Sequence, residues 1–261
     1  MTTPQPEQHS PLEPEQRFSR TAQVIGPAGV ERLQHSHVAI FGLGGVGGYA
    51  VEALARAGIG HLSLIDFDNF SLTNINRQLH ALDTTIGQAK VDVVAQRCLE
   101  INPQLHLTCH SMRYTNAVAD TLLNQTYDYV LDCIDTISAK IDLIEQCRLR
   151  NLAIISSMGA ANKIDPTLVK IADLFNTEKC RLARIMRKEL RRRGIKTQVP
   201  VVYSLEEYRP PLTAQPSKVR VSGENWQQPP LGSIATIPSL FGIMMAGVVV
   251  KHLVEKTDEL I

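Results

Sequence analysis

The hydrophobic and polar positions of the chain alternate between short apolar segments and longer amphipathic ones. Residues 37–41 (HVAIF) and 61–65 (HLSLI) are largely apolar, have the length of strands and are followed at once by glycine or aspartate. Between them, residues 49–57 have the spacing of an amphipathic helix, and Gly58 can adopt the left-handed conformation that ends a helix. Residues 88–101 repeat the helical spacing. The pattern therefore predicts strand, helix, strand and helix in succession.

The same alternation continues through the middle of the chain. We predict strands at residues 105–110, 129–131 and 153–156, and a helix at residues 143–151. Strands that alternate with helices form a parallel sheet covered by helices. The sequence therefore predicts an α/β fold, with a Rossmann-like, mainly parallel sheet and helices on both faces. Ligands bind to such sheets at the carboxyl ends of the strands.

The two ends of the chain depart from this pattern. Residues 1–16 are rich in Pro, Gln and Glu and lack an apolar segment, so we expect a disordered tail. Residues 178–193 predict a strongly basic helix, and residues 206–230 predict a Pro-rich loop. Residues 231–250 carry no charge and approach the length of a membrane span, but Pro238 interrupts them. We expect a buried core helix there and no stable membrane insertion.

Composition narrows the class of protein. The chain has 261 residues, of which 44% are hydrophobic, and a formal net charge of +1, so it can bury one sizeable core. The five cysteines form no C-x-x-C pair, which favours a reduced, cytoplasmic chain over a disulfide framework. No set of Ser, His and Asp stands out as a nucleophilic triad, so candidate chemistry must come from other residues.

A glycine-rich loop is the first such candidate. Residues 42–48 (GLGGVGG) follow a predicted strand and open a predicted helix, as a dinucleotide-binding loop does. Glycines let the backbone approach phosphates closely, and the start of a helix favours their negative charge. Asp66, at the end of the next strand, can accept hydrogen bonds from ribose hydroxyls. These features alone fit an NAD enzyme as well as an ATP enzyme.

Charged and polar residues after Asp66 separate the two cofactors. Asp68 is followed by Asn74 and Arg77 in TNINRQ, and then by Lys90 in GQAK. A triphosphate that is about to lose pyrophosphate carries more charge than a nicotinamide pyrophosphate, and additional cations stabilise its reaction. Arg77 and Lys90 are candidates for that role, although either could be an ordinary surface charge.

Five motifs together resemble a known superfamily. GLGGVGG, DFD, NINRQ, GQAK and LDCIDT, in this order and spacing, resemble the adenylating domain of the ThiF, MoeB and ubiquitin-activating enzymes. The resemblance implies one ThiF-type domain at residues 17–261, with a nucleotide-binding core at 17–165. Residues 166–261 would then form a C-terminal extension that contains the basic helix, the Pro-rich loop and the core helix.

The resemblance also implies roles for single residues. The implied nucleotide contacts are Gly42, Gly44, Gly45, Asp66, Asp68, Asn74, Arg77, Lys90 and Asp135. Asp135 is implied to organise Mg²⁺, and Arg20 to reach into the ATP site of the partner subunit in a homodimer. The implied catalytic residues are Arg20, Arg77, Lys90 and Asp135.

The rest of the chain is similar to one branch of this superfamily, the tRNA threonylcarbamoyladenosine dehydratases. The supporting segments are RFSRTAQVIG, SSMGAANKIDPTLVKIADL, VVYSLEEYRPP and GSIATIPSLFGIMMAGVVVKHL, and no cysteine follows Cys180. Such enzymes use ATP and Mg²⁺ to adenylate the carboxylate of a threonylcarbamoyl group on a tRNA adenosine. Loss of AMP by intramolecular attack then gives a cyclic hydantoin. The resemblance allows a monovalent cation (Na⁺ or K⁺) and a sulfur-transfer protein as a partner.

The basic segment favours an anionic macromolecule as a further partner. Clustered Lys and Arg bind phosphate backbones through counterion release, without reading the base sequence. The candidate tRNA contacts are Arg187, Lys188, Arg191, Arg192 and Arg193. A solvated helix face or a dimer contact would have the same composition.

Three other functions remain open from the sequence. The chain could adenylate the C-terminus of a ubiquitin-like sulfur-carrier protein with the same nucleotide motifs. It could use the glycine loop for NAD as an oxidoreductase, or bind a nucleotide for regulation without catalysis. A basic helix is less useful for a small carrier protein than for tRNA, and the joint presence of Arg77, Lys90 and Asp135 argues against the last reading.

Overall fold

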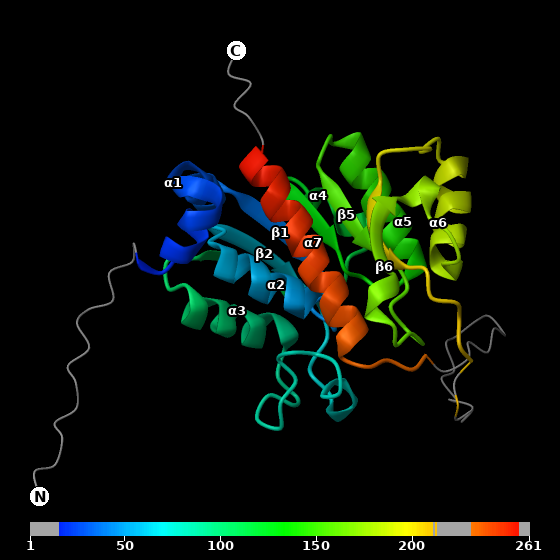
Figure 1. Cartoon of the computed structure of the whole chain (residues 1–261), viewed down its shortest axis with the longest axis horizontal. Helices are drawn as coiled ribbons and strands as arrows, with labels where there is room; N and C mark the ends of the chain where they lie inside the picture. The colour runs from blue at the N-terminus through cyan, green and yellow to red at the C-terminus, as the bar shows by residue number, and fades with distance from the viewer. Residues whose placement is uncertain (1–15, 211, 213–230, 256–261) are drawn as a thin grey trace, which may run out of the picture.

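The computed structural model describes residues 16–210, 212 and 231–255. Its centre is a seven-stranded sheet in the order β3-β2-β1-β4-β5-β7-β6, with helices on both faces (Figure 1). The predicted tail, except for Gln16, and most of the predicted Pro-rich loop lie outside the described residues.

The bounds of the elements are as follows. The strands are β1 (His37–Phe41), β2 (His61–Ile65), β3 (His106–His110), β4 (Tyr129–Asp132), β5 (Ile154–Ser157), β6 (Val169–Asp173) and β7 (Pro200–Ser204). The α-helices of the described residues are α1 (Ser19–His35), α2 (Gly47–Ala57), α3 (Lys90–Ile101), α4 (Ala119–Leu122), α5 (Ile137–Leu149), α6 (Arg181–Arg192) and α7 (Thr236–Glu255).

The sheet is parallel except at one edge, which confirms the predicted fold class. His37, His61 and His106 are partners in the register of β1, β2 and β3, and only β6 pairs antiparallel, with β7. The apolar pattern missed both of these last strands. β6 is an edge strand that exposes Lys170 and Ile171, so polar and exposed positions interrupt its pattern. β7 is a short apolar run that begins with Pro200, and the prediction overlooked it.

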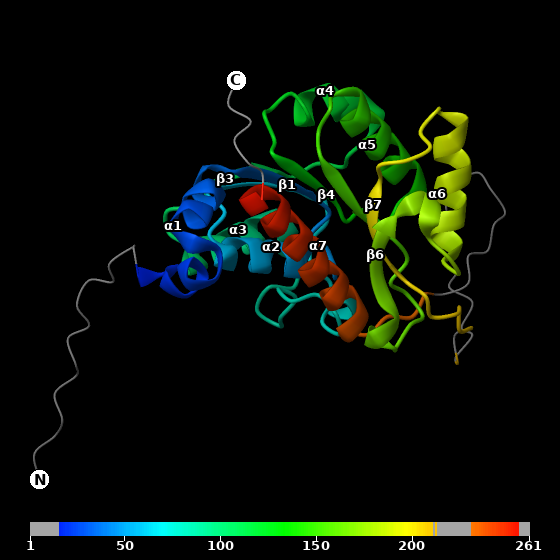
Figure 2. The ribbon, with the colours of Figure 1, turned by 45° about the horizontal axis from the view of Figure 1, so that its top comes forward.

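Two hydrophobic layers cover the two faces of the sheet. One layer packs α2, α3 and α7 against the strands, and the other packs α4, α5 and α6. Figure 2 separates the layers, with α2 and α7 on one side of the strands and α4 and α5 on the other. The arrangement leaves the carboxyl ends of β1, β2, β4 and β5 and the loops after them free to form a site.

Helix α7 explains the long apolar stretch near the C-terminus. It is the one helix of the described residues that is long and apolar enough to cross a membrane, with a mean hydropathy of 1.8. Phe241, Met245 and Val249 are fully buried in the core, while Ile243 is 51% exposed. Gly242 lies so close to α2 that an added Cβ would come within 2.2 Å of the Val46 carbonyl oxygen. The expectation of a core helix is therefore confirmed.

Two other helices differ from the prediction. Helix α5 begins at Ile137, six residues before the predicted start at residue 143. The prediction missed its first turns because they carry polar residues, one of which, Lys140, is buried. Helix α1 was not predicted, because glycine followed by proline at residues 26 and 27 is unfavourable inside a helix. In the structure Gly26 takes a non-helical conformation, so the helix is kinked there. In both places tertiary packing outweighs a local pattern that argues against a helix.

Three histidines are the first residues of neighbouring strands and lie together at the amino-terminal ends of β1, β2 and β3. The rings of His37 and His61 stack with centroids 3.5 Å apart, and those of His61 and His106 lie 6.2 Å apart. Burial, and then the charge of His61, lowers the pKa of His37 from 6.5 to about 4. Burial, and then the charge of His106, also lowers the pKa of His61.

We expect this cluster to make the protein less stable in mild acid. Because the folded state keeps His37 neutral, the unfolded chain binds more protons between pH 6.5 and pH 4, and stability falls as the pH drops through that window. The expected contribution is about 1–2 kcal/mol, after a discount for the partial exposure of the ring. Urea unfolding at pH 7 and pH 4.5 measures it: His37→Gln should lessen the difference in unfolding free energy, whereas replacement of the exposed His35 should not. An equal pH response in both variants would contradict this assignment.

Candidate active site

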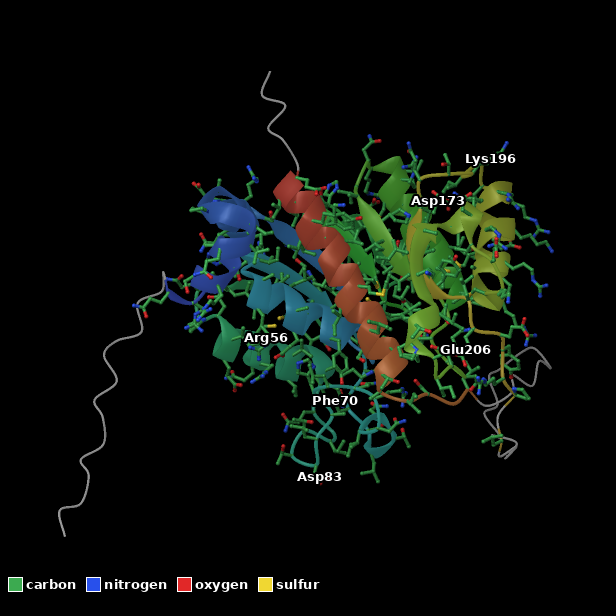
Figure 3. All side chains as sticks on the ribbon, in the orientation of Figure 1. Arg56, Phe70, Asp83, Asp173, Lys196 and Glu206 are labelled. Carbon is green, nitrogen blue, oxygen red and sulfur yellow. The ribbon has the colours of Figure 1, made fainter. Side chains whose placement is uncertain are left out.

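A cavity of about 1000 Å³ opens at the carboxyl ends of the strands. Loops after β1, β2, β3, β4 and β5 line it, together with the start of α7. Figure 3 shows the loop with Phe70 and Asp83, which projects beyond the sheet near the start of α7; Asn69 and Ser71 of this loop line the cavity. The volume is at the upper end of the range for small-molecule sites, so it can hold a nucleotide together with part of a second substrate.

The glycine loop forms the floor of this cavity. Gly42 has a φ of +92°, and a Cβ there would lie 2.8 Å from the Cys133 carbonyl oxygen at the end of β4. A Cβ on Gly47 would lie 1.8 Å from the Gly42 carbonyl oxygen. Gly44 and Gly45 also line the cavity. Gly42 and Gly47 are therefore required by close packing of the loop, which presents the backbone around Gly44 and Gly45 to a ligand.

Asp66 holds this loop in place. Its Oδ2 accepts a hydrogen bond from the Leu43 backbone N–H at 2.6 Å, and its Oδ1 accepts one from the Asp68 N–H at 2.8 Å. The residue is only 8% exposed and lines the cavity. The predicted ribose contact of Asp66 stays a prediction, and the structure adds that its carboxylate connects the loops after β1 and β2.

Lys90 places a positive charge on the wall of the cavity. It is the first residue of α3, is 5% exposed and lines the cavity. Its Nζ lies 3.1 Å from Oδ2 of Asp68, whose side chain is about half exposed. A partly dehydrated cation acts on a nearby phosphate more strongly than one in bulk water does.

Asn74 and Arg77 form the adjoining wall. The Asn74 Oδ1 accepts a hydrogen bond from the Ser71 N–H at 3.1 Å, which completes a capping box on the short 3₁₀ helix Leu72–Asn74. The Arg77 Nη1 donates to the Thr73 carbonyl oxygen and to the Asn76 Oδ1, both at 2.9 Å. These bonds fix one end of the guanidinium group on the wall of the cavity.

Asp135 is exposed on the loop after β4 and lines the same cavity. Its Oδ1 accepts a hydrogen bond from the Thr136 hydroxyl at 3.3 Å. Among the described residues, no group of three or more His, Cys, Asp and Glu side chains could hold a metal ion. Mg²⁺ needs no such group, because it commonly takes one or two carboxylates and completes its shell with phosphate oxygens and water. Asp135, which lines the same cavity as the glycine loop, therefore fits a Mg²⁺ site that phosphate oxygens complete.

The family assignment follows from this geometry and from sequence comparison. A model of the family described as ThiF matches residues 18–260, almost the whole chain. The chain belongs to the ThiF family.

Two further comparisons identify similar ThiF proteins across nearly the whole chain. The tRNA threonylcarbamoyladenosine dehydratase of Bacillus subtilis (strain 168) is 42% identical over 249 residues, which cover 93% of this chain and 96% of that protein. The crystal structure of Escherichia coli TcdA, a tRNA N6-threonylcarbamoyladenosine dehydratase in complex with ATP, superposes with a TM-score of 0.82. It is 32% identical and covers 92% of this chain and 94% of that one.

Another kind of enzyme, an adenylyltransferase, matches a shorter region. The molybdopterin-synthase adenylyltransferase of Escherichia coli (strain K12) is 37% identical over 137 residues. That match covers 52% of this chain and 54% of that protein. The likeness is therefore limited to about half of either chain.

The structure brings together all but one of the predicted nucleotide-binding and catalytic residues. Those that line the cavity are Gly42, Gly44, Gly45, Asp66, Asp68, Asn74, Arg77, Lys90 and Asp135. Arg20 is exposed near the start of α1 and is not among the described residues that line the cavity of its own chain. That placement agrees with a role in another subunit without testing it.

The sequence prediction missed several residues at the end of the cavity beside β3 and α5. The Arg113 guanidinium lies over the ring of Phe67, 4.1 Å from its centroid. The Tyr114 hydroxyl and the Asn116 amide each donate to the Asp142 carboxylate at 2.8 Å. Burial, and then the bond to Asp142, raises the pKa of Tyr114. These residues share no compact motif, and only the crossing of the loop after β3 over α5 brings them together.

The five predicted tRNA contacts of this ThiF chain differ in their surroundings. Arg187 is half-buried, and its Nη1 donates to the Thr177 carbonyl oxygen at 2.9 Å, so this side chain holds the segment before α6. Arg193 pairs with Glu145 and lines the cavity. The other three, Lys188, Arg191 and Arg192, are exposed. The structure neither confirms nor contradicts tRNA binding, but the exposed residues suit it better than Arg187 does.

Proposed function

We propose that this ThiF-family chain is an ATP-dependent tRNA threonylcarbamoyladenosine dehydratase. It adenylates the carboxylate of the threonylcarbamoyl group on a tRNA adenosine, and cyclisation with loss of AMP gives the hydantoin. The observation that carries the proposal is the joint placement of Arg77, Lys90 and Asp135 around one glycine loop, in a chain that is 42% identical to the Bacillus subtilis dehydratase over nearly its full length.

The residues of the cavity suit the first step. The substrate carboxylate is ionised at neutral pH and needs no general base before it attacks the α-phosphate of ATP. Catalysis of this step depends on positioning the two reactants and on stabilising the charge that moves to pyrophosphate. Arg77 and Lys90 supply fixed positive charge, and Mg²⁺ held by Asp135 would neutralise further phosphate charge when bound.

The second step requires no enzyme thiol, and the cysteines agree with this. Cys180 is buried, and its Sγ accepts a hydrogen bond from the Ala183 N–H at the start of α6. Cys133 lines the cavity, but burial, and then the charge of Asp132, raises the pKa of its thiol well above the usual range. Cys133 is therefore a poor nucleophile at neutral pH.

The alternative is adenylation of the C-terminus of a ubiquitin-like sulfur-carrier protein. The same nucleotide residues would serve it, but the match to the molybdopterin-synthase adenylyltransferase covers only about half of the chain. ATP–pyrophosphate exchange separates the two functions. We expect tRNA that carries threonylcarbamoyladenosine to stimulate the exchange, and a carrier protein that ends in Gly-Gly to leave it unchanged; the reverse result would favour the alternative.

We propose that the exposed cations of α6 bind the tRNA backbone. Arg184 and Lys188 are exposed, and α6 lies beside the cavity, because Leu182 of α6 and Arg193, which follows the helix, line it. Arg184→Glu/Lys188→Glu should weaken tRNA binding at least tenfold and reduce its dependence on salt, since two phosphate contacts are lost. Binding of ATP should not change. Filter binding across a range of salt concentrations measures both effects.

A charge-matched control separates local contacts from net charge. Lys170 on β6 and Lys251 on α7 are also exposed, and Lys170→Glu/Lys251→Glu changes the net charge by the same amount. We expect a smaller loss of tRNA affinity in this control. Equal losses in both double variants would show that α6 is not a specific contact surface.

We further propose that the working unit is a homodimer in which Arg20 completes the partner's site. The exposed position of Arg20 outside its own cavity supports this, as does the outward apolar side of α7 around Ile243. Mixed subunits of Arg20→Ala and Asp135→Asn should regain activity, because one of the two sites in each heterodimer then has both residues. Failure of exchanged subunits to complement would remove Arg20 from the partner's site.

The remaining assignments follow from this function. A tRNA substrate and five free cysteines support a cytoplasmic location. A monovalent cation and a sulfur-transfer partner stay predictions, because the described residues assign no contacts to either.

A further inference from the structure

The loop that carries Asp135 is bound by the buried side chain of Lys140. Asp135 itself is exposed, and the hydrogen bond from Thr136 is too long to orient its carboxylate firmly. The direction of this side chain is therefore set by the backbone on either side of it. We propose that Lys140, paired with Asp132, is a positioning residue that fixes the loop so that Asp135 faces the phosphates and Mg²⁺. This inference rests on the proposed nucleotide site.

Lys140 binds both neighbours of Asp135. Its Nζ donates to the Ile134 carbonyl oxygen at 3.0 Å, and its backbone N–H donates to the Thr136 carbonyl oxygen at 3.0 Å. The same Nζ lies 2.9 Å from Oδ2 of Asp132 and 3.4 Å from the Asp132 carbonyl oxygen. The residue before the exposed carboxylate is thus bound by the side chain of Lys140, and the residue after it by the backbone of Lys140 in the first turn of α5.

Asp132 and Ser156 secure this lysine in the sheet. Asp132 is the last residue of β4, and its Oδ2 accepts a hydrogen bond of 2.5 Å from the Ser156 hydroxyl on β5. Its Oδ1 accepts one of 3.2 Å from the Ile134 N–H. Asp132, Lys140 and Ser156 are all 0% exposed. The loop is therefore connected to two central strands and one helix through side chains that solvent does not reach.

The location of the pair argues for more than general stability. A buried ion pair is weak evidence for stability, because the loss of hydration of both charges offsets most of their attraction. An apolar pair at this place would pack as well but would leave the Ile134 carbonyl oxygen without its Lys140 donor. The loop also touches the glycine loop, since the Cys133 carbonyl oxygen is the atom nearest to a Cβ on Gly42. Movement of this loop would therefore displace Asp135 relative to the bound phosphates.

The test removes both charges of the pair together. Lys140→Met alone leaves a buried, unpaired Asp132, and such a variant is expected to unfold at a lower temperature. Lys140→Met/Asp132→Asn avoids the unpaired charge and keeps similar side-chain volumes. Tyr127→Phe is the matched control, because it removes one buried hydrogen bond, from Tyr127 to the Leu122 carbonyl oxygen, in the same layer but away from the cavity.

Binding of ATP and AMP at equilibrium is the readout, with and without Mg²⁺. We expect Lys140→Met/Asp132→Asn to bind AMP like the wild type, because Asp66 and the glycine loop are intact. Its gain in ATP affinity on addition of Mg²⁺ should be at least tenfold smaller than that of the wild type. Tyr127→Phe should keep the full gain.

Each outcome bears on a definite claim. If the double variant responds to Mg²⁺ as Tyr127→Phe does, the pair is structural only and the inference is overturned. If the Asp135→Asn variant and the wild type respond equally, Asp135 does not hold Mg²⁺, and the proposed site fails together with the inference. If only Asp135→Asn loses the response, the site stands and the role of Lys140 is wrong.

Discussion

Asp135→Asn is expected to lower the rate of adenylate formation at least 100-fold. The substitution keeps the size of the side chain but removes the negative charge that we propose holds Mg²⁺ beside the phosphates. Loss of one electrostatic contact in a transition state of this kind costs about two to three orders of magnitude in rate. Single-turnover release of pyrophosphate at saturating ATP and tRNA measures the step directly.

A second aspartate provides the control for this substitution. Asp83 is exposed on the loop that projects at the rim, but it does not line the cavity (Figure 3). Asp83→Asn should keep the rate of the wild type. A rate for Asp135→Asn within a few-fold of that control would show that the carboxylate is not part of the site.

Lys90→Met is expected to lower the same rate by about two orders of magnitude, with a smaller change in ATP affinity. Lys90 is buried on the cavity wall, so in the proposed reaction its charge would act on the leaving pyrophosphate with little screening by water. Its partner Asp68 is about half exposed and can be hydrated when the lysine is removed, so the fold should persist. Single-turnover rates and equilibrium ATP binding, measured on one preparation, separate the two effects.

The result for Lys90 also distinguishes binding from catalysis. If Lys90→Met weakens ATP binding and leaves the single-turnover rate intact, the lysine binds the ground state and the transition state equally. Our assignment of its role would then be wrong. Lys170→Met, on the exposed edge strand β6, should change neither quantity.

Local pattern predicts β1 to β5, the strands that alternate with helices along the chain. β1, β2 and β4 are short apolar runs that end in glycine or aspartate, and the structure places them in the centre of the sheet. β6 exposes Lys170 and Ile171 at an edge, so its pattern is ambiguous, and its pairing with β7 depends on contacts between distant segments. The part of this fold that local sequence predicts poorly is the antiparallel pair β6 and β7, since the other edge strand, β3, was predicted although His106 and Cys109 are exposed.

The candidate site also contains residues that the sequence predicts and residues that it does not. The motifs around Gly44, Arg77 and Lys90 predict residues that the cavity does bring together. The contacts between Asp142 and Tyr114, and between Lys140 and Asp132, have no motif, because each depends on how α5 crosses the carboxyl ends of the strands. Lys140 also interrupts the apolar face of α5, which moved the predicted start of that helix. A buried charge thus obscures the local pattern at the place where it supports the site.

The most direct test of the proposed function is mass spectrometry of tRNA nucleosides. tRNA that carries threonylcarbamoyladenosine is incubated with the purified protein, ATP and Mg²⁺, digested under mild conditions and compared with a sample that contains Asp135→Asn. We predict that the modified nucleoside loses the mass of one water, with formation of AMP and pyrophosphate, only in the sample with the active protein. An unchanged nucleoside mass under conditions in which the protein adenylates a carrier protein would contradict the account.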